Sequence, residues 1–298
     1  MLQNYDERNA DVRYWVNGVL RHRDEPGLSP FDSVVQGGDA VWEGLRLYSG
    51  KIFGLTEHLD RLRRSALALG FVDIPKHAEI VDAVSATLRA NGMTDGVHIR
   101  LTLTRGVKVT SGMDPRLNQA GPTLIVLPEH KAPVYDTSGL SLVTASVRRP
   151  GPAVLDPKIH HNNLLNSILA KLEANVAGAD DAMMLDERGF VAETNATNLF
   201  AVVDGALHTP TSAACPEGIT RATILKIAPS SGLPVVVRDI SQAEMYAVDE
   251  VFCTGTMGEV AGVTRIDGRP IGNGQVGPVT LRVAALYRDH AATHGEPV

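Results

Sequence analysis

Lysine is scarce in this chain, and one lysine stands apart from the others. The 298 residues include only seven lysines against 21 arginines. Most of them fall in turns, in an irregular connecting segment or within amphipathic helices, where a solvated ammonium group is the usual outcome. Lys158 instead follows Asp156-Pro157 in an irregular segment and precedes a helix with an apolar stripe. A partly desolvated lysine loses proton affinity and can attack a carbonyl carbon, so Lys158 is a candidate for Schiff-base chemistry. An ordinary solvated lysine stays the alternative.

A carboxylate in apolar surroundings is the second candidate group. Glu193 lies near the end of the strand-like stretch Phe190–Thr194, among apolar and small residues. A carboxylate needs a partner to remain charged in such a place, and the N–H of a pyridinium ring would be one. That bond keeps the ring protonated and makes it a better electron sink, as pyridoxal phosphate (PLP) chemistry requires. A carboxylate that caps the Thr194-Asn195 turn remains an open alternative.

Two stretches could bind a phosphate group. Gly218-Ile219-Thr220-Arg221 opens a predicted helix, whose free backbone N–H groups, dipole and threonine hydroxyl would suit an anion. Thr254-Gly255-Thr256 ends the strand-like stretch 250–256 and could supply a second set of donors. An ordinary capped helix remains the alternative to the first.

Three other chemistries are disfavoured by context. Residues 272–277 match G-x-G-x-x-G, but the chain ends before the further strand and acidic residue that a dinucleotide site needs. His160 and His161 are adjacent and point in different directions, so hydrogen-bonding or packing roles are favoured and no metal site is predicted. No G-x-S-x-G motif of a serine hydrolase occurs.

Composition narrows the class of protein further. The 28 basic and 34 acidic residues give a net charge of −6, which argues against a nucleic-acid partner. No apolar stretch approaches the roughly 18 to 20 residues that span a bilayer, and the first 18 residues resemble neither a signal nor a transit peptide. Cys215 and Cys253 suit reduced thiols. A cytoplasmic protein without a membrane contact is expected.

The first part of the chain has the patterns of an α+β domain. Strands are predicted for 13–20, 40–53, 97–104 and 122–128. A helix is expected after Thr56, a candidate N-cap, with a second over 77–92. The first helix places its apolar residues on one stripe, namely Leu59, Leu62, Ala66 and Leu69. Periodicity then stops, so we predict a small N-terminal domain at 1–128 and a linker at 129–138.

The remainder, 139–298, is predicted to be a larger domain that mixes strands and helices. A strand at 140–147 and a helix over 161–178 come first, and an apolar stripe on that helix comprises Leu164, Leu165, Ile168, Leu172 and Val176. Short strands follow, with a hairpin turn at Asp204-Gly205, a helix from Gly218 and a last helix from Pro278. These patterns predict an α/β chain of the α+β type without regular βαβ alternation.

Several motifs in order resemble one known family. They are K-x-H-H-N-N-L-L-N from Lys158, DDAMMLDERGFVAETNATNLF from Asp180, EGITRAT from Glu217 and DEVFCTGTMGE from Asp249. They are similar to the class IV, fold type IV PLP-dependent aminotransferases, which include branched-chain, D-amino-acid and (R)-amine transaminases and 4-amino-4-deoxychorismate lyase. The stretches 31–62 and 98–115 look most like the plant D-amino-acid transaminase, also described as branched-chain aminotransferase-like. The resemblance covers nearly the whole chain.

This resemblance implies a fold and a set of roles. The fold would be PLP fold type IV, with a small N-terminal α+β domain, a larger C-terminal pseudo-barrel domain and the cofactor between them. Lys158 would form the internal aldimine and move a proton between the substrate's Cα and the cofactor's C4′, while Glu193 would bind the pyridine nitrogen. The cofactor's phosphate would be bound by Arg61, Gly218, Ile219, Thr220 and Thr256. The family is usually a homodimer or larger, and residues 106–115 would form a loop that closes a neighbour's site.

The substrate is predicted from departures within the same motifs. Gly37, His98 and Asn163 stand where bacterial branched-chain enzymes carry tyrosines. Arg46 and Arg100 are retained, and guanidinium groups suit carboxylates, so we expect both to bind the substrate carboxylate. His98, Thr256 and Met257 complete the predicted substrate site. The leading hypothesis is transfer of an amino group from D-amino acids to pyruvate or 2-oxoglutarate; the alternatives are a branched-chain L-amino-acid aminotransferase and 4-amino-4-deoxychorismate lyase.

Overall fold

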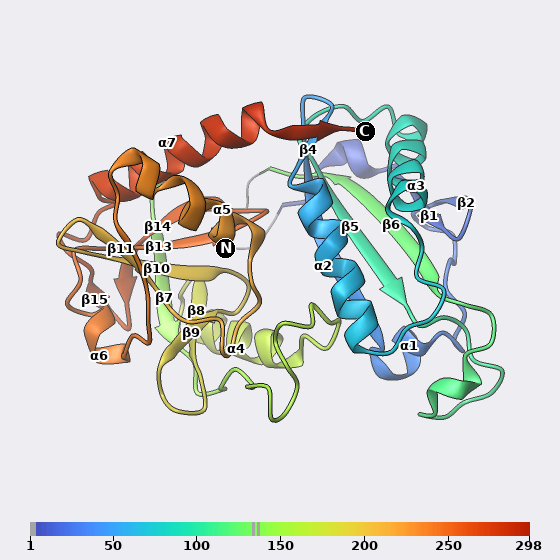
Figure 1. Ribbon diagram of the computed structural model, residues 1–298, viewed down its shortest axis with the longest axis horizontal. Coiled ribbons are helices and arrows are strands. Elements are labelled where there is room, and N and C mark those ends of the chain that lie inside the picture. Colours follow the sequence, from blue (N-terminus) through green and yellow to red (C-terminus); the bar gives the residue numbers. More distant parts are fainter. Residues whose placement is uncertain (1–3, 133–134, 136–137) are drawn as a thin grey trace. The chain divides into compact units, whose positions relative to one another are not determined.

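The computed structural model describes residues 4–132, 135 and 138–298, which form two compact units (Figure 1). The N-terminal unit contains residues 4–132, Ile159–Asn163 and His294–Val298. The C-terminal unit contains residues 135, 138–158 and Leu164–Thr293. The units therefore differ from the two continuous segments predicted from the sequence, because the chain returns twice to the N-terminal unit. Residues 133, 134, 136 and 137 of the predicted linker lie outside the described residues.

Backbone hydrogen bonds explain why residues 159–163 belong to the N-terminal unit. The Trp42 N–H donates to His160 O at 3.0 Å, and the Asn162 N–H donates to Ala40 O at 2.9 Å. The His160 N–H also donates to the Ser65 side chain at 3.0 Å. Residues 159–163 thus pair along the start of a strand of the N-terminal unit, and the helix predicted from 161 begins only at Leu165.

The N-terminal unit is an antiparallel sheet with two packed helices. The sheet order is β16-β4-β3-β5-β6-β1-β2, with the strands β1 Arg13–Val16, β2 Val19–His22, β3 Ala40–Tyr48, β4 Lys51–Phe53, β5 Val97–Thr104, β6 Thr123–His130 and β16 Gly295–Pro297. The helices are α1 Ser33–Gly37, α2 Leu55–Ala68 and α3 His77–Ala90, with 3₁₀ turns at Glu7–Asn9 and Pro115–Leu117. Helix α2 packs against β3, and α3 packs against β6 and β1.

Two predicted strands are hairpins in the structure. The stretch 13–20 turns at Asn17-Gly18, where φ is 43° and 90°. The stretch 40–53 turns in the same way at Ser49-Gly50, with φ of 46° and 77°. Two consecutive positive φ values match the twist of paired antiparallel strands, which is why Asn-Gly favours such turns. The alternating pattern predicted strands correctly but did not reveal the turns inside them.

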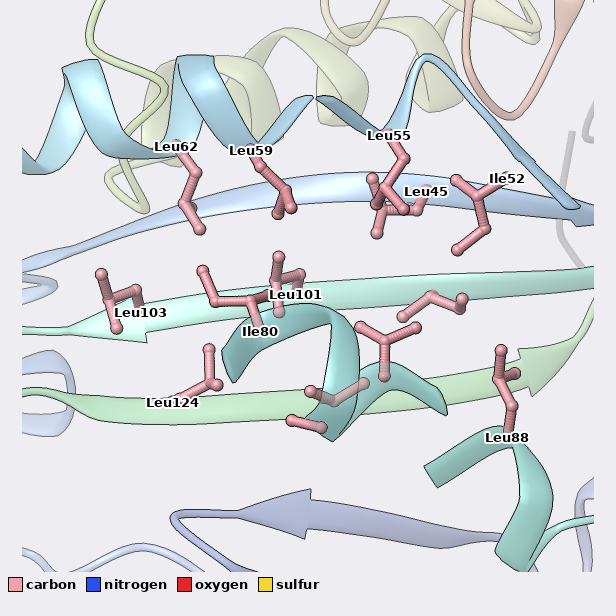
Figure 2. Close-up of a cluster of buried hydrophobic side chains, with 14 of the residues drawn as sticks. Leu45, Ile52, Leu55, Leu59, Leu62, Ile80, Leu88, Leu101, Leu103 and Leu124 are labelled. Atoms are coloured by element: carbon pink, nitrogen blue, oxygen red, sulfur yellow. The ribbon is translucent and has the colours of Figure 1, made fainter. Parts of the chain in front are cut away.

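The apolar stripe of α2 faces the sheet as predicted. Leu59, Leu62 and Ala66 are buried against residues of β3, β5 and α3. Figure 2 shows leucine and isoleucine side chains from these helices and strands meeting in one cluster. The predicted N-cap was wrong, because Gly54 precedes the helix. Thr56 instead donates its backbone N–H and its hydroxyl to the Glu296 carboxylate at 2.8 and 2.7 Å, so β16 supplies the anion at this helix start.

The C-terminal unit is a mixed sheet with four helices in its described residues. The strand order is β12-β11-β10-β13-β14-β7-β8-β9, and β15 pairs with β14. The strands are β7 Leu140–Thr144, β8 Asp181–Leu185, β9 Val191–Thr194, β10 Asn198–Val203, β11 Ala206–Thr209, β12 Val235–Val237, β13 Glu250–Gly255, β14 Glu259–Ile266 and β15 Arg269–Pro270. The helices are α4 Leu165–Val176, α5 Ile219–Ile227, α6 Gln242–Met245 and α7 Pro278–Thr293, with a 3₁₀ turn at Pro229–Ser231.

A tight turn connects β9, at one end of this strand path, to β10 in the other half of the path. The Thr194 N–H donates to Thr197 O at 2.8 Å, so β9 leads directly into β10 although the two strands are distant in the sheet order. Residues at the end of β9 therefore lie beside residues at the start of β10. None of the helices in the part of the chain that the structure describes is long and apolar enough to cross a membrane.

Helix α4 does not bury the stripe that its sequence displays. Its buried residues are Ala170 and Ala174, which pack with Ala182 and Met184 of β8. The larger apolar side chains are exposed in the single chain, including Leu165 at 72%, Ile168 at 52%, Leu169 at 47%, Leu172 at 53% and Val176 at 91%. The prediction of a helix is confirmed, and its apolar stripe is exposed in the single chain because close approach to the sheet selects the alanine face.

Candidate active site

Lys158 is the last residue of the C-terminal unit before the chain returns to β3. Its backbone N–H donates to Asp156 Oδ1 at 3.0 Å, a local turn typical of Asp-Pro segments. The side chain is exposed, and its ammonium group makes no hydrogen bond or ion pair with the described residues. The expected partial desolvation is therefore absent in the single chain. The amine is available to a ligand.

Glu193 is buried near the end of β9. It is 5% exposed and lies opposite Met184 of β8. Its Oε1 forms an ion pair with the Arg149 guanidinium, and its Oε2 accepts from Asn198 Nδ2 at 3.3 Å. The adjacent turn has its own cap, because Thr194 Oγ1 accepts the N–H of Thr197 at 2.9 Å. A buried carboxylate with charged and neutral donors is suited to remain ionised.

Arg149 and Asn198 are site residues that the sequence did not point to. Arg149 lies after β7 and is fixed by a backbone N–H bond to Leu185 O at 2.9 Å and by a guanidinium bond to Ser167 Oγ at 3.2 Å. Asn198 also donates to Pro216 O at 3.3 Å. The signal that could have found Arg149 is the need of a buried carboxylate for a cation, but the sequence does not say which of 21 arginines supplies it.

The start of α5 is open, as a phosphate site requires. Its N-cap is Gly218, which supplies no side-chain capping bond, so the first N–H groups of the helix are not capped by a side chain. A Cβ atom at Gly218 would lie 2.0 Å from Asn198 Oδ1, so only glycine fits there. Thr220 of the first turn is buried.

The end of β13 lies next to the same asparagine. Thr254 pairs with Asn198 across β13 and β10, and its buried Oγ1 has no hydrogen-bond partner among the described residues. Asn198 therefore lies next to Glu193, Gly218 and the end of β13. Thr256 and Met257, which follow this strand, are partly buried. A carboxylate, an uncapped helix start and an orphaned hydroxyl fit a ligand with a ring N–H and a phosphate group.

In the N-terminal unit, Arg61 belongs to a closed ionic cluster. Its Nε and Nη2 donate to the two oxygens of Glu43 at 2.8 and 2.6 Å, and His58 Nδ1 lies 2.7 Å from Glu43 Oε2. Burial opposes the ionisation of Glu43, but the charges of Arg61 and His160 hold the pKa of Glu43 well below its ordinary value. The Glu43 carboxylate thus fixes the orientation of the Arg61 guanidinium.

His160 packs in the same region. It stacks on Trp42 with ring centroids 4.3 Å apart, and its Nδ1 contacts Trp42 O. Burial, followed by the charge of Arg61, lowers the pKa of His160. The packing and hydrogen-bonding role predicted for this histidine agrees with these contacts.

Three predicted substrate residues lie on one face of β3 and β5. Arg46 pairs with His98, and Gly44 pairs with Arg100, so the side chains of all three share a face. Arg100 donates to Asn162 Oδ1 at 2.8 Å, and its guanidinium lies 3.6 Å above the Trp42 ring. A Cβ at Gly44 would lie 3.3 Å from the His98 ring, so glycine leaves room for this histidine.

The same face is basic and incompletely hydrogen-bonded. Arg46 is 5% exposed, and its Nε and Nη1 have no hydrogen-bond partner within the described ranges. Burial lowers the pKa of Arg100 to about 10, although the Glu43 charge acts in the opposite direction. Burial lowers the pKa of His98 to about 3, helped by Lys131, Arg100 and Arg46, so its ring is neutral at pH 7. One buried and one partly buried guanidinium group beside a neutral imidazole favour an anionic ligand.

Two other predicted features belong to this unit. Asn163 donates to Gly38 O at 3.1 Å, next to Gly37, so two of the three positions expected to replace tyrosines lie near each other. In the predicted loop 106–115, Lys108 Nζ donates to Gly112 O at 2.5 Å, and Met113 is 98% exposed.

Comparison with known families decides the affiliation. The family model described as amino-transferase class IV matches residues 40–266. The chain belongs to this family. Among class IV relatives, branched-chain-amino-acid aminotransferase-like protein 2 of Arabidopsis thaliana is 54% identical over 97% of this chain and 52% of its own length. The chain thus spans about half the length of this relative and of a second plant protein like it.

Full-length similarity is found with other class IV proteins. The D-alanine aminotransferase of Bacillus licheniformis is 32% identical over 92% of this chain and 95% of its own. The crystal structure of the T.th. branched-chain amino acid aminotransferase, complexed with N-(5'-phosphopyridoxyl)-L-glutamate, has a TM-score of 0.88, 35% identity and 95% coverage of both chains. The predicted fold, α+β with PLP fold type IV architecture, is confirmed.

Proposed function

We propose that this chain is a PLP-dependent transaminase, which transfers an amino group from an amino acid to a 2-oxo acid. The observation that carries the proposal is buried Glu193 with Arg149 and Asn198 beside the uncapped start of α5. Class IV membership and the cofactor derivative named in the solved relative support the same cofactor here.

Different residues are proposed to bind the ring and the phosphate group of the cofactor. When bound, PLP supplies an aldehyde and a ring that withdraws electrons from the substrate's Cα. Glu193 would accept the ring N–H, and the N–H groups of Ile219 and Thr220, with Gly218 allowing the approach and with the Thr256 hydroxyl, would bind the phosphate. Arg61, held by Glu43, is proposed as a further phosphate ligand.

Lys158 is proposed as the catalytic residue. Its exposed amine would bind the cofactor's aldehyde carbon, and after substrate has displaced it the amine would move a proton to and from the substrate's Cα. The Asp156 bond to the backbone of Lys158 fixes the start of this side chain.

The substrate carboxylate is proposed to bind on the face of β3 and β5. Arg46 has guanidinium nitrogens without a hydrogen-bond partner among the described residues, and Arg100 is oriented by Trp42 and Asn162. His98 is neutral at pH 7, so the positive charge of this face comes from the two arginines. Arg100→Ala should raise the KM for 2-oxoglutarate sharply, and an unchanged KM would reject this role. Met257 is proposed as a further substrate contact.

For the amino donor we propose D-amino acids, with branched-chain L-amino acids as the second candidate. The first rests on the stretches 31–62 and 98–115, which look most like the plant D-amino-acid transaminase, and it agrees with the D-alanine aminotransferase relative. The names of the plant relatives and of the solved T.th. enzyme favour the second. The side of the cofactor on which the substrate carboxylate lies distinguishes the two.

One experiment tests cofactor and donor together. Purified protein loaded with PLP should absorb in the visible region, and this band should be absent in Lys158→Ala. Wild-type protein that binds no PLP would contradict the proposed function. D- and L-amino acids are then compared by loss of the band in single half-reactions, with aminodeoxychorismate included and pyruvate release monitored. Reaction with L-leucine or L-valine alone would replace the D-amino-acid proposal with the second candidate.

We also propose that the chain forms a homodimer or larger homo-oligomer. The support is the exposed apolar side chains of α4, because contiguous apolar surface of this kind marks association sites. Leu172→Glu should shift the sedimentation coefficient toward that of a single chain. Leu281→Glu, at an equally exposed leucine of α7, is the control and should leave the sedimentation coefficient unchanged.

A further inference from the structure

Glu193 forms an ion pair with Arg149, a residue that belongs to none of the sequence motifs described above. We propose that Arg149 is a positioning residue for the transaminase reaction: it keeps the Glu193 carboxylate anionic and oriented, so that the proton shared with the cofactor rests on the ring nitrogen. The inference rests on the proposed function, because it presupposes that Glu193 faces a pyridine ring. Arg149 is thereby added to the proposed site as the residue that determines the charge of the ring.

The geometry fixes both oxygens of Glu193 from separate elements. Arg149, from the segment after β7, contacts Oε1, and Asn198, from the start of β10, donates to Oε2 at 3.3 Å. Asn198 is held by Pro216 O, and Arg149 is held by Ser167 of α4 and by Leu185 O. The carboxylate is clamped between two donors that are themselves anchored, so its rotation is restricted.

The charges around Glu193 are asymmetric. Arg149 is the cation in direct contact, and its side chain is only 12% exposed, so water screens the pair weakly. The buried Cys215 thiol is also close enough to interact, and burial with the Glu193 charge raises its pKa to about 12, so it stays neutral. Arg221 and Glu217 act on this thiol from farther along the chain. The Arg149 guanidinium therefore places a positive charge in direct contact with the carboxylate.

This asymmetry decides the position of a shared proton. When a carboxylate and a ring nitrogen share one proton, both groups are charged if the proton is on nitrogen and both are neutral if it is on the carboxylate, so stabilising the carboxylate anion favours the proton on nitrogen. A cation in contact with the carboxylate favours its anionic form and thereby places the proton on nitrogen. Removing the charge of Arg149 would move the proton to Glu193 and leave the ring neutral, a poorer electron sink.

Nuclear magnetic resonance of the loaded protein tests this directly. The PLP-loaded enzyme is prepared with ¹⁵N in the cofactor ring, and the ring ¹⁵N shift is recorded for wild type, Arg149→Gln and Arg149→Lys. We expect the protonated-ring signal in wild type, its loss in Arg149→Gln, which keeps amide donors but not the charge, and its return in Arg149→Lys. Circular dichroism and thermal unfolding confirm that each variant is folded.

A matched control removes a neighbouring charge. Arg148 donates to Ala145 O at 2.9 Å rather than to Glu193, so Arg148→Gln should leave the ring signal unchanged. A folded Arg149→Gln that keeps the protonated signal, or a folded Arg149→Lys that loses it, would overturn the inference. Wild-type protein that binds no PLP contradicts the proposed function instead. The two failures are therefore distinguishable.

Discussion

Glu43 in the N-terminal unit and Glu193 in the C-terminal unit are both buried carboxylates in contact with an arginine, but their neighbours differ. Glu43 is fully enclosed and receives donors from two residues of α2, with His160 nearby. Glu193 contacts Arg149 and Asn198, and near it lie an uncapped helix start and a hydroxyl without a partner among the described residues.

The difference distinguishes a structural cluster from a ligand site. Natural proteins satisfy nearly all of their buried polar groups, and exceptions gather where a ligand completes the set. The Glu43 cluster satisfies itself, so its charges stabilise the fold and orient Arg61. The polar groups around Asn198 remain partly unsatisfied in the protein alone. Burial of a carboxylate is common to both and does not separate the two roles.

The largest effect is expected from breaking the closed cluster. Glu43→Gln leaves the buried Arg61 and His58 without their anion, and breaking a buried ion pair in this way costs about 3–5 kcal/mol in the free energy of unfolding. Urea denaturation measures this loss. Glu193→Gln should cost less, because Arg149 keeps its bond to Ser167. Equal losses for the two variants would remove the distinction between the clusters.

The second effect concerns activity at Glu193. Glu193→Gln cannot supply the anion that the ring N–H needs, so the half-reaction with an amino acid should slow about 100-fold. This corresponds to about 2.7 kcal/mol of activation free energy. Stopped-flow absorbance gives the rate. Glu187→Gln, at an exposed glutamate of the same β8–β9 connection, is the control and should retain the wild-type rate. Wild-type speed in Glu193→Gln would contradict the assigned role.

The smallest effect, taken per pH unit, is a pH dependence from the basic face of β3 and β5. The pKa of His98 is lowered from 6.5 to about 3 in the folded protein. Below pH 6.5 the unfolded chain binds a proton that the folded chain rejects, so His98 lowers stability as the pH falls from 6.5 toward 3. The slope is about 1.4 kcal/mol per pH unit. Urea midpoints at several pH values should show this slope reduced in His98→Gln, and an identical slope in both proteins would contradict it.

The sequence predicted what depends on local pattern. Strand β5 and the buried stripe of α2 follow from side-chain periodicity, and both were found where the pattern placed them. The hairpin at Asn17-Gly18 was missed although its turn residues were visible, because the alternation of the flanking strands continued across it. On α4 the pattern predicted a helix but not its covered face, since apolar residues look alike whether they pack against a sheet or another surface.

The candidate site divides in the same way. Lys158, Glu193 and Gly218 could be named from residue type, context and family resemblance. Arg149 and Asn198 could not, because each meets Glu193 only through the arrangement of β7, β9 and β10. Arginine is frequent in this chain, and an asparagine at a strand start has no pattern of its own. Long-range partners of a known residue therefore require the structure.

The return of residues 159–163 to β3 has a consequence for Lys158. Two and four residues beyond this lysine, His160 and Asn162 form backbone hydrogen bonds with β3, while the Asp156 side chain accepts the backbone N–H of the lysine itself. The proposed reactive amine is thus carried by the covalent junction of two independently packed bodies. The backbone position of Lys158 therefore depends on residues that belong to both units.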